Sequence, residues 1–195
     1  MEYRITQYPL EQGALEIQYI EEFFGEFPRR KTASEIVARL KDRDHSILMA
    51  TAPLGDGTSV PVSYKVAHEI RAHENIPKLK DLVARLRDCV EFDDRKILYS
   101  WIGGTRRDWR GQGHFRALTE QQEAWALQHT FDEILVKTKN RFYEMRGTLD
   151  HLRFDVIKYE PHPDNHESKV YLSKKLRPDL LDSHRSMRTV VQVEA

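Results

Sequence analysis

The stretch from residue 95 to residue 138 constrains the fold most strongly, because its periodicity changes twice. The segment "RKILYSWIGG" at residues 95–104 predicts a strand that ends in two glycines, and "HFRALTEQQEAWALQHT" at residues 114–130 predicts a helix. The short apolar run "EILVKT" at residues 133–138 is typical of a strand buried on both faces. A strand, a glycine-rich loop, a helix and a strand make a βαβ unit, whose two strands run parallel. We therefore expect an α/β fold built around this unit.

The flanking segments predict antiparallel strands and covering helices. The runs "SILMATAP" and "VPVSYKVA" flank the turn residues of "LGDGTS" and predict a hairpin. Further strands are predicted at "EYRITQY", "FDVIKYE" and "VYLSKKL", and helices at "GALEIQYIEEFFGEF", "TASEIVARLKDR", "PKLKDLVARLRDCV" and "RFYEMRGTLDHL". Thr32 and Glu35 form a capping-box pattern at the start of the second of these helices. The predicted fold class is thus α/β, a mixed central sheet with flanking helices.

The length and composition describe one globular domain. The 195 residues, of which 39% are hydrophobic and 32% charged, fit a single domain. We expect residues 1–176 to form it and residues 177–195 to be a tail that is disordered or used in self-association, which leaves a homodimer open. No run of about 18 apolar residues and no signal-peptide pattern occurs, so no membrane contact is expected. The single cysteine fits a reducing compartment, and a cytoplasmic location is expected.

Between the first strand of the βαβ unit and its helix, arginines surround two glycines in "RRDWRGQGHFRALTE" at residues 106–120. A helix N-terminus presents unpaired backbone N–H groups and a partial positive charge, and Gly111 and Gly113 let the backbone approach a ligand closely. Arginines add charge-assisted hydrogen bonds, which suits a diphosphate. The structural alternative is that the glycines only shape the turn. The P-loop and the dinucleotide-binding pattern are excluded, since no Lys-Ser or Lys-Thr follows and Arg116 stands at the third glycine position.

The string "GGTRRDWRGQGHFRALTEQQEAWA" resembles the acetyl-CoA-binding segment of the GCN5-related N-acetyltransferase (GNAT) superfamily, where a strand end leads through R/Q-x-x-G-x-G/A into a helix. Residues 110–114 match this pattern in register, while its last position, normally Gly or Ala, is Phe115. The usual Val and Pro upstream are Thr105 and Arg107. The string "ILVKTKNRFYEMRGTLDHLRFDVIKYEP" resembles the next family segment, with Arg153 and Phe154 at its "GF" pair. The resemblance covers about residues 96–176.

This resemblance implies an N-acetyltransferase that transfers the acetyl group of acetyl-CoA directly to a primary amine of a small molecule or protein, in a ternary complex. It places the cofactor-binding core at about residues 96–160. In the family the cofactor-bearing strand splays from its neighbour, which implies free backbone groups from Trp101 to Thr105. The expected cofactor-binding residues are Ile102, Gly103, Gly104, Thr105, Arg110, Gly111, Gln112, Gly113, His114, Phe115 and Asn140.

Acetyl transfer requires a neutral amine, a polarised thioester carbonyl and a protonated leaving thiolate, so a base and an acid are expected. Alignment on Phe154 puts Leu149 at the position of the family's usual tyrosine acid. Tyr143 is therefore the candidate general acid, and Glu69, which follows His68 at the end of a strand, is the candidate base. The alternatives are that Tyr143 packs at a helix end, that the His-Glu pair is merely solvated, and that a chain of waters serves as the base.

No metal is expected. The histidines follow no HExxH or other ligand spacing; those considered are His114, His129, His151, His162 and His166. For the acceptor, a helix inserted at residues 76–90 is the expected specificity element, or else it simply covers one face of the sheet.

Two other functional classes remain at this point. A non-catalytic acyl-CoA-binding or interaction module is favoured by Leu149 and Phe115, which depart from the family pattern. A nucleic-acid binder could use the "RRDWR" cluster with Trp109. Thirty-one basic residues balance thirty-one acidic ones, so nucleic acid is not expected as a partner.

Overall fold

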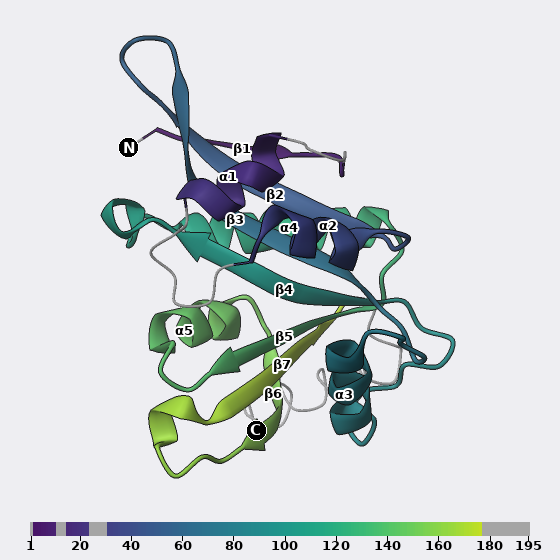
Figure 1. Ribbon diagram of the computed structural model, residues 1–195. Coiled ribbons are helices and arrows are strands. Elements are labelled where there is room, and N and C mark those ends of the chain that lie inside the picture. Colours follow the sequence, from purple (N-terminus) through teal and green to yellow (C-terminus); the bar gives the residue numbers. More distant parts are fainter. Residues whose placement is uncertain (1, 11–14, 24–30, 177–195) are drawn as a thin grey trace, which may run out of the picture.

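The computed structural model describes residues 2–10, 15–23 and 31–176 (Figure 1). Its centre is a seven-stranded sheet with the strand order β1-β2-β3-β4-β5-β7-β6. The strands are β1 (Arg4–Gln7), β2 (His45–Pro53), β3 (Ser59–Ile70), β4 (Ile97–Thr105), β5 (Glu133–Lys139), β6 (Asp155–Glu160) and β7 (Lys169–Lys175). β4 and β5 pair parallel, and the other neighbours in the sheet pair antiparallel. The predicted mixed sheet, with its parallel pair in the βαβ unit, is confirmed.

Helices cover both faces of this sheet. They are α1 (Leu15–Phe23), α2 (Ala33–Leu40), α3 (Pro77–Leu86), α4 (His114–Gln128) and α5 (Tyr143–His151), with short 3-10 turns at Arg107–Trp109 and Asn165–Glu167. In Figure 1, α1, α2 and α3 lie in front of the sheet and α4 lies behind it. This three-layer arrangement follows from the apolar stripe of each helix, which must be buried against a sheet face.

The core has a layer on each side of the sheet. On the front face, Ile17 of α1 and Ile36 of α2 pack with Val66 of β3, and Leu82 of α3 packs with Tyr99 of β4. On the back face, Ala126 of α4 and Leu149 of α5 are buried. They pack in one cluster with Leu98 of β4, Val136 of β5 and Leu172 of β7. Because strand side chains alternate between faces, β4 contributes to both layers.

The elements predicted within the described residues are all present, with some differences at their ends. The capping box of α2 is confirmed: the Thr32 hydroxyl accepts from the backbone N–H of Glu35 at 3.2 Å, and the Glu35 carboxylate accepts from that of Thr32 at 2.9 Å. α3 is shorter than predicted, because it ends at Leu86 instead of continuing to residue 90. The end of the predicted first helix and the tail at residues 177–195 lie outside the described residues, so the domain boundary stays a prediction.

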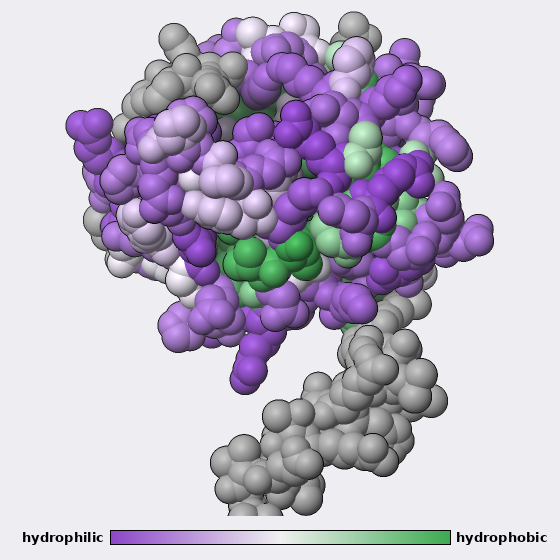
Figure 2. All heavy atoms as spheres, turned by 90° about the horizontal axis from the view of Figure 1, so that it is seen from below, coloured by the Kyte–Doolittle hydropathy of each residue, from purple (hydrophilic) through white to green (hydrophobic). Residues whose placement is uncertain are grey.

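The surface seen from below the view of Figure 1 is mostly hydrophilic, with hydrophobic side chains visible near its centre and on its right side (Figure 2). Within the described ranges, no helix combines the length and the hydropathy needed to cross a bilayer.

Candidate cofactor cleft and active site

β4 and β5 begin as a parallel pair and then part. They pair from Ile97, opposite Glu133, to Ser100, opposite Val136. Beyond this point β5 continues beside β7, and β4 continues beside β3 to Thr105. Figure 1 shows the two strands diverging toward their C-terminal ends. The edge of residues 101–105 that faces β5 therefore has no strand partner in the described structure, and its backbone groups can bind an extended ligand.

A β-bulge marks the place where the strands part. Ser100 pairs with Ala67 and Ile102 with Val66, so Trp101 is the extra residue of β4. The indole of Trp101 is held on the front face: the Arg39 guanidinium lies 4.4 Å from the ring centroid, and the His68 ring centroid is 5.6 Å away. A bulge bends and twists its strand, which gives a physical cause for the departure of β4 from β5.

The loop after β4 leads into an open helix N-terminus. Gly111 and Gly113 have left-handed backbones, with φ of +73° and +80°. Gly113 is the N-cap of α4, and no side chain caps the helix there. A Cβ atom added at Gly111 or Gly113 would meet no atom within 4 Å. The first N–H groups of α4 thus lie beside open space without a capping side chain, the arrangement in which helix N-termini bind anions.

The imidazole of His114 anchors this helix end through contacts within the protein. It is 2% exposed, and its Nδ1 lies 2.8 Å from the hydroxyl oxygen of Ser63 on β3. The ring of Tyr3 stacks on it at 3.9 Å, and Trp109 contacts it edge-on at 5.9 Å. Burial lowers the pKa of His114. His114 therefore packs the start of α4 against Ser63 and Tyr3, a contact that the sequence pattern did not reveal.

Two residues of the loop contact their surroundings in different ways. Arg110 donates from Nε to the carbonyl oxygen of Thr105 at 3.1 Å, which connects the two ends of the loop. The Oε1 atom of Gln112 is buried and has no hydrogen-bond partner in the described structure. An unpaired buried acceptor costs about 1–3 kcal/mol, so a ligand donor at this position would be favourable.

On the other side of the open edge, the end of β5 leads to α5. Asn140 is nearly buried, donates its backbone N–H to the Ser168 carbonyl at 2.9 Å, and accepts a side-chain hydrogen bond from Arg146. Tyr143 is 56% exposed, with its hydroxyl oxygen 3.4 Å from Nδ1 of His166. Leu149 is fully buried in the back layer of the core. The position of the family's usual acid therefore belongs to the packing, and the role of Tyr143 stays a prediction.

The candidate base lies in the closed part of the sheet. Glu69 pairs with Leu98, where β4 is still joined to β5, and its carboxylate accepts from Arg71 at 3.1 Å. The neighbouring His68 donates from Nδ1 to the Glu69 carbonyl oxygen at 2.7 Å. Burial lowers the pKa of His68 to about 3. His68 is fully buried and Glu69 is paired with Arg71, so the pair is not merely solvated, and the role of Glu69 as a base stays a prediction.

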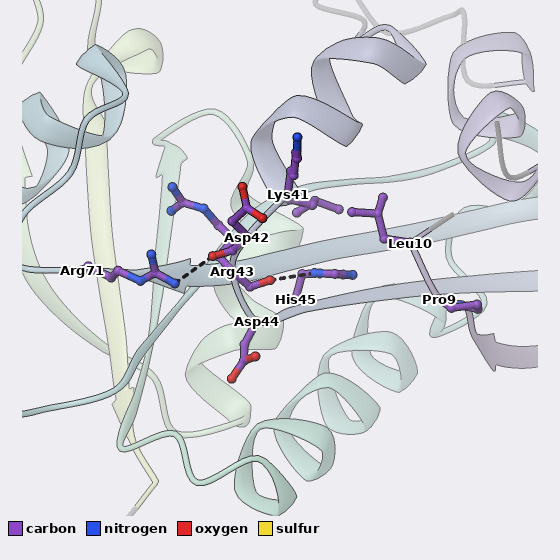
Figure 3. Close-up of a pocket in the computed structure, with 9 residues that line it drawn as sticks. Pro9, Leu10, Lys41, Asp42, Arg43, Asp44, His45 and Arg71 are labelled. Carbon is purple, nitrogen blue, oxygen red and sulfur yellow. Dashed lines mark hydrogen bonds between the residues drawn. The ribbon is translucent and has the colours of Figure 1, made fainter. Parts of the chain in front are cut away.

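A separate hollow of about 560 Å³ lies at the opposite end of the strands (Figure 3). It is lined by Pro9, Leu10, Leu40, Lys41, Asp42, Arg43, Asp44, His45 and Arg71. Arg71 donates to the Asp42 carbonyl at 3.0 Å, and His45 bonds the Arg43 carbonyl at 2.8 Å, both drawn as dashed lines in Figure 3. These polar groups bind one another. The register of the sheet puts the hollow at the start of β2, far from the turn of Gly111 and Gly113 that follows β4, called the glycine turn below.

Two further expectations concern metal and acceptor. The described residues hold no group of three or more His, Cys, Asp or Glu side chains arranged for a metal ion. The helix expected to select the acceptor, α3, packs its buried face on Ile97 and Leu135, and its Arg85 forms an ion pair with Glu160 of β6. This is the covering role that the sequence left as the alternative, and a role in acceptor selection stays a prediction.

No protein-family profile matches the sequence, and no curated protein matches it. Solved structures do match. NAA60 of Arabidopsis thaliana in complex with acetyl-CoA has a TM-score of 0.65 and 12% identity, with 88% of this chain and 98% of that chain covered. The NatC complex bound to Gag peptide and CoA gives 0.63 and 15%, covering 89% and 99%. The ribosomal-protein-S18-alanine N-acetyltransferase of Escherichia coli gives 0.60 and 13%, covering 90% and 96%. The parted strands, the bulge and the glycine turn are thus set in the fold of the GNAT acetyltransferase superfamily, as the segment at residues 96–176 predicted.

Proposed function

We propose that this protein is an acetyl-CoA-dependent N-acetyltransferase that acetylates a primary amine by direct transfer in a ternary complex. The observation that carries the proposal is the open edge of residues 101–105 beside the uncapped N-terminus of α4. Similar structures were solved with acetyl-CoA or CoA. One of them also holds a peptide, and another is named for an alanine of a ribosomal protein, so the amine of a peptide is the first acceptor class to test.

The residues of the cleft suit the parts of this cosubstrate. Acetyl-CoA would supply the acetyl group as a thioester. The N–H groups at the start of α4, with Gly111 and Gly113 keeping the space clear, would bind the pyrophosphate. The free backbone groups of β4 would pair with the amides of the pantetheine arm. A backbone N–H near the bulge at Trp101 would polarise the thioester carbonyl, as preorganised donors do in acyl transfer.

Proton transfer is the part of the reaction for which the chain departs from its family. Leu149 cannot protonate a thiolate, and Tyr143 is the residue that we assign to this role, through its exposed hydroxyl at the start of α5. Glu69 is held by Arg71 in the closed part of the sheet, so the proposal keeps a chain of water molecules as the alternative base. The cofactor residues on β4 and α4 and the residues Asn140 and Tyr143 would then lie on the two sides of the bound thioester.

A non-catalytic acyl-CoA-binding module is the second candidate, because the buried Leu149 removes the family's acid. Release of free thiol from acetyl-CoA, followed with a panel of peptides with free N-termini and of small amines, separates the two. Transfer to at least one amine, reduced in Tyr143→Phe at saturating acetyl-CoA, supports the enzyme and the assigned acid. Binding of CoA without transfer to any amine supports the module. A chain that binds no CoA in calorimetry contradicts both.

A further inference from the structure

Lys65 is a buried cation that no sequence pattern connects with cofactor binding. It lies in the middle of β3, opposite Gly103 of β4, and is 4% exposed. Its neighbours along the strand, Tyr64 and Val66, point into the front layer of the core. Since strand side chains alternate, Lys65 points to the back face, where α4 lies.

The glycine opposite Lys65 gives the side chain its path. A Cβ atom at Gly103 would lie 3.0 Å from the carbonyl oxygen of Tyr64 and 3.6 Å from Cγ of Lys65. A larger residue at position 103 would therefore press on β3 and on the lysine stem. Gly103 belongs to the open edge of β4. The stem of Lys65 lies against this glycine on the back face of the sheet, on the side of the cleft between β4 and β5.

The ammonium ends at α4, the helix that follows the turn of Gly111 and Gly113. Its Nζ lies 4.5 Å from the ring centroid of Phe115, the second residue of α4. In the described structure no carboxylate lies within ion-pair distance of Lys65. A buried ammonium without an anion costs several kcal/mol, and a cation at a helix N-terminus is opposed by the helix dipole as well. An anion between the ammonium and the helix would offset both costs.

We propose that Lys65 is a cofactor-binding residue whose ammonium ion-pairs with the pyrophosphate of CoA, between the open edge of β4 and the first turn of α4. The inference rests on the proposed function. A pyrophosphate is the anion that the geometry favours, because Lys65 and the uncapped N–H groups of α4 would contact it from two sides. Phe115, which stands where the family has Gly or Ala, then supplies an aromatic ring for the same ammonium.

The proton balance of binding gives this contact a signature. Burial lowers the pKa of Lys65 to about 7, so the free protein carries it mostly neutral at pH 8. The titratable and charged groups on the helix that packs against it are His114, whose Nδ1 bonds Ser63, and Arg116, which pairs with Glu120. An anion beside Lys65 raises its pKa again, and the protein then takes up about one proton for each ligand bound at pH 8.

The experiment is calorimetric titration of the full chain at pH 8, in buffers of different ionisation enthalpy, with dephospho-CoA and with CoA. Dephospho-CoA keeps the pyrophosphate and lacks the 3'-phosphate, so the comparison of the two ligands shows which phosphate group Lys65 contacts. Wild type is expected to take up about one proton with either ligand. Lys65→Met is expected to abolish the uptake and to weaken both ligands by about tenfold to a hundredfold.

The matched control is Lys137→Met, which removes another lysine that lies over an aromatic ring, that of Tyr171, on the front face of the sheet. It is expected to keep the affinity and the proton uptake of wild type. Thermal unfolding without ligand completes the set, since removal of an unpaired buried charge is not expected to lower the melting temperature of Lys65→Met.

Several results would overturn the proposal, and one would instead concern the proposed function. A loss seen with CoA and absent with dephospho-CoA would place Lys65 at the 3'-phosphate and overturn the proposal. Equal affinity of wild type and Lys65→Met, no proton uptake by wild type, or weaker binding that accompanies a lower melting temperature would overturn it as well. If wild type binds neither ligand, the failure is that of the proposed function.

Discussion

At the scale of single residues, His68 is held neutral by the packing around it. Its ring is fully buried between Tyr99 and Trp101, and burial, with smaller contributions from Arg43 and Arg39, lowers its pKa from 6.5 to about 3. Between pH 6.5 and about pH 3, His68 is therefore protonated in the unfolded chain and neutral in the folded chain. The stabilising effect is present above pH 6.5 and is lost as the pH falls toward 3.

We predict that His68→Gln flattens the pH dependence of stability in this window. Between pH 6.5 and pH 4.5 the free energy of unfolding of wild type should fall by about 2–3 kcal/mol more than that of the variant, since each unit of pKa difference is about 1.4 kcal/mol. Urea denaturation at a series of pH values measures this. Parallel curves for the two proteins would show that His68 is protonated as easily when folded as when unfolded.

At the scale of elements, the start of α4 depends on the left-handed backbone of its N-cap. A valine at position 113 would be strained at φ +80° whatever the space around it, so its effect on cofactor binding would be mixed with an effect on folding. Asparagine tolerates this backbone, and its side chain would enter the open space beside the first turn. Gly113→Asn is therefore the cleaner test of the anion site.

We predict that Gly113→Asn keeps the circular dichroism spectrum and the melting temperature within a few degrees of wild type, and weakens CoA by about tenfold or more. Gly57→Asn is the control, because Gly57 has a similar φ of +85° in the β2-β3 turn. It is expected to leave CoA affinity unchanged. Unaltered affinity in Gly113→Asn would place the phosphates away from this turn.

At the scale of the whole molecule, a cosubstrate that spans β4, β5 and α4 binds only the folded chain. We predict that CoA at about 100 times its dissociation constant stabilises the protein by about 2.7 kcal/mol. For a domain of this size the melting temperature should then rise by about 5–10 °C. ATP at the same concentration is the control, because it lacks the pantetheine arm and should shift the transition little. A transition that CoA leaves in place would contradict the assignment of the cleft.

The sequence was sufficient where local rules decide the outcome. Alternation and helical spacing predicted the strands and helices, and the pair Thr32 and Glu35 predicted the cap of α2 that the structure confirms. The glycines at 111 and 113 predicted a turn with open space, because a left-handed backbone favours glycine whatever lies around it. The sequence did not reveal Lys65 as a candidate site residue, because its surroundings depend on the pairing of β3 with β4.

What remained was decided by contacts between residues distant in the chain. Leu149 became part of the core because α5 packs on β5 and β7, and Glu69 bound Arg71 in the closed part of the sheet. The bulge at Trp101 depends on the register between β3 and β4, which no single strand encodes. The sequence alone therefore determined the elements and the glycine turn. Only the tertiary structure decided which backbone edge of β4 stays open and that Lys65 lies against Gly103 of that edge. The reason is that strand pairing and burial depend on groups that come together only when the chain folds.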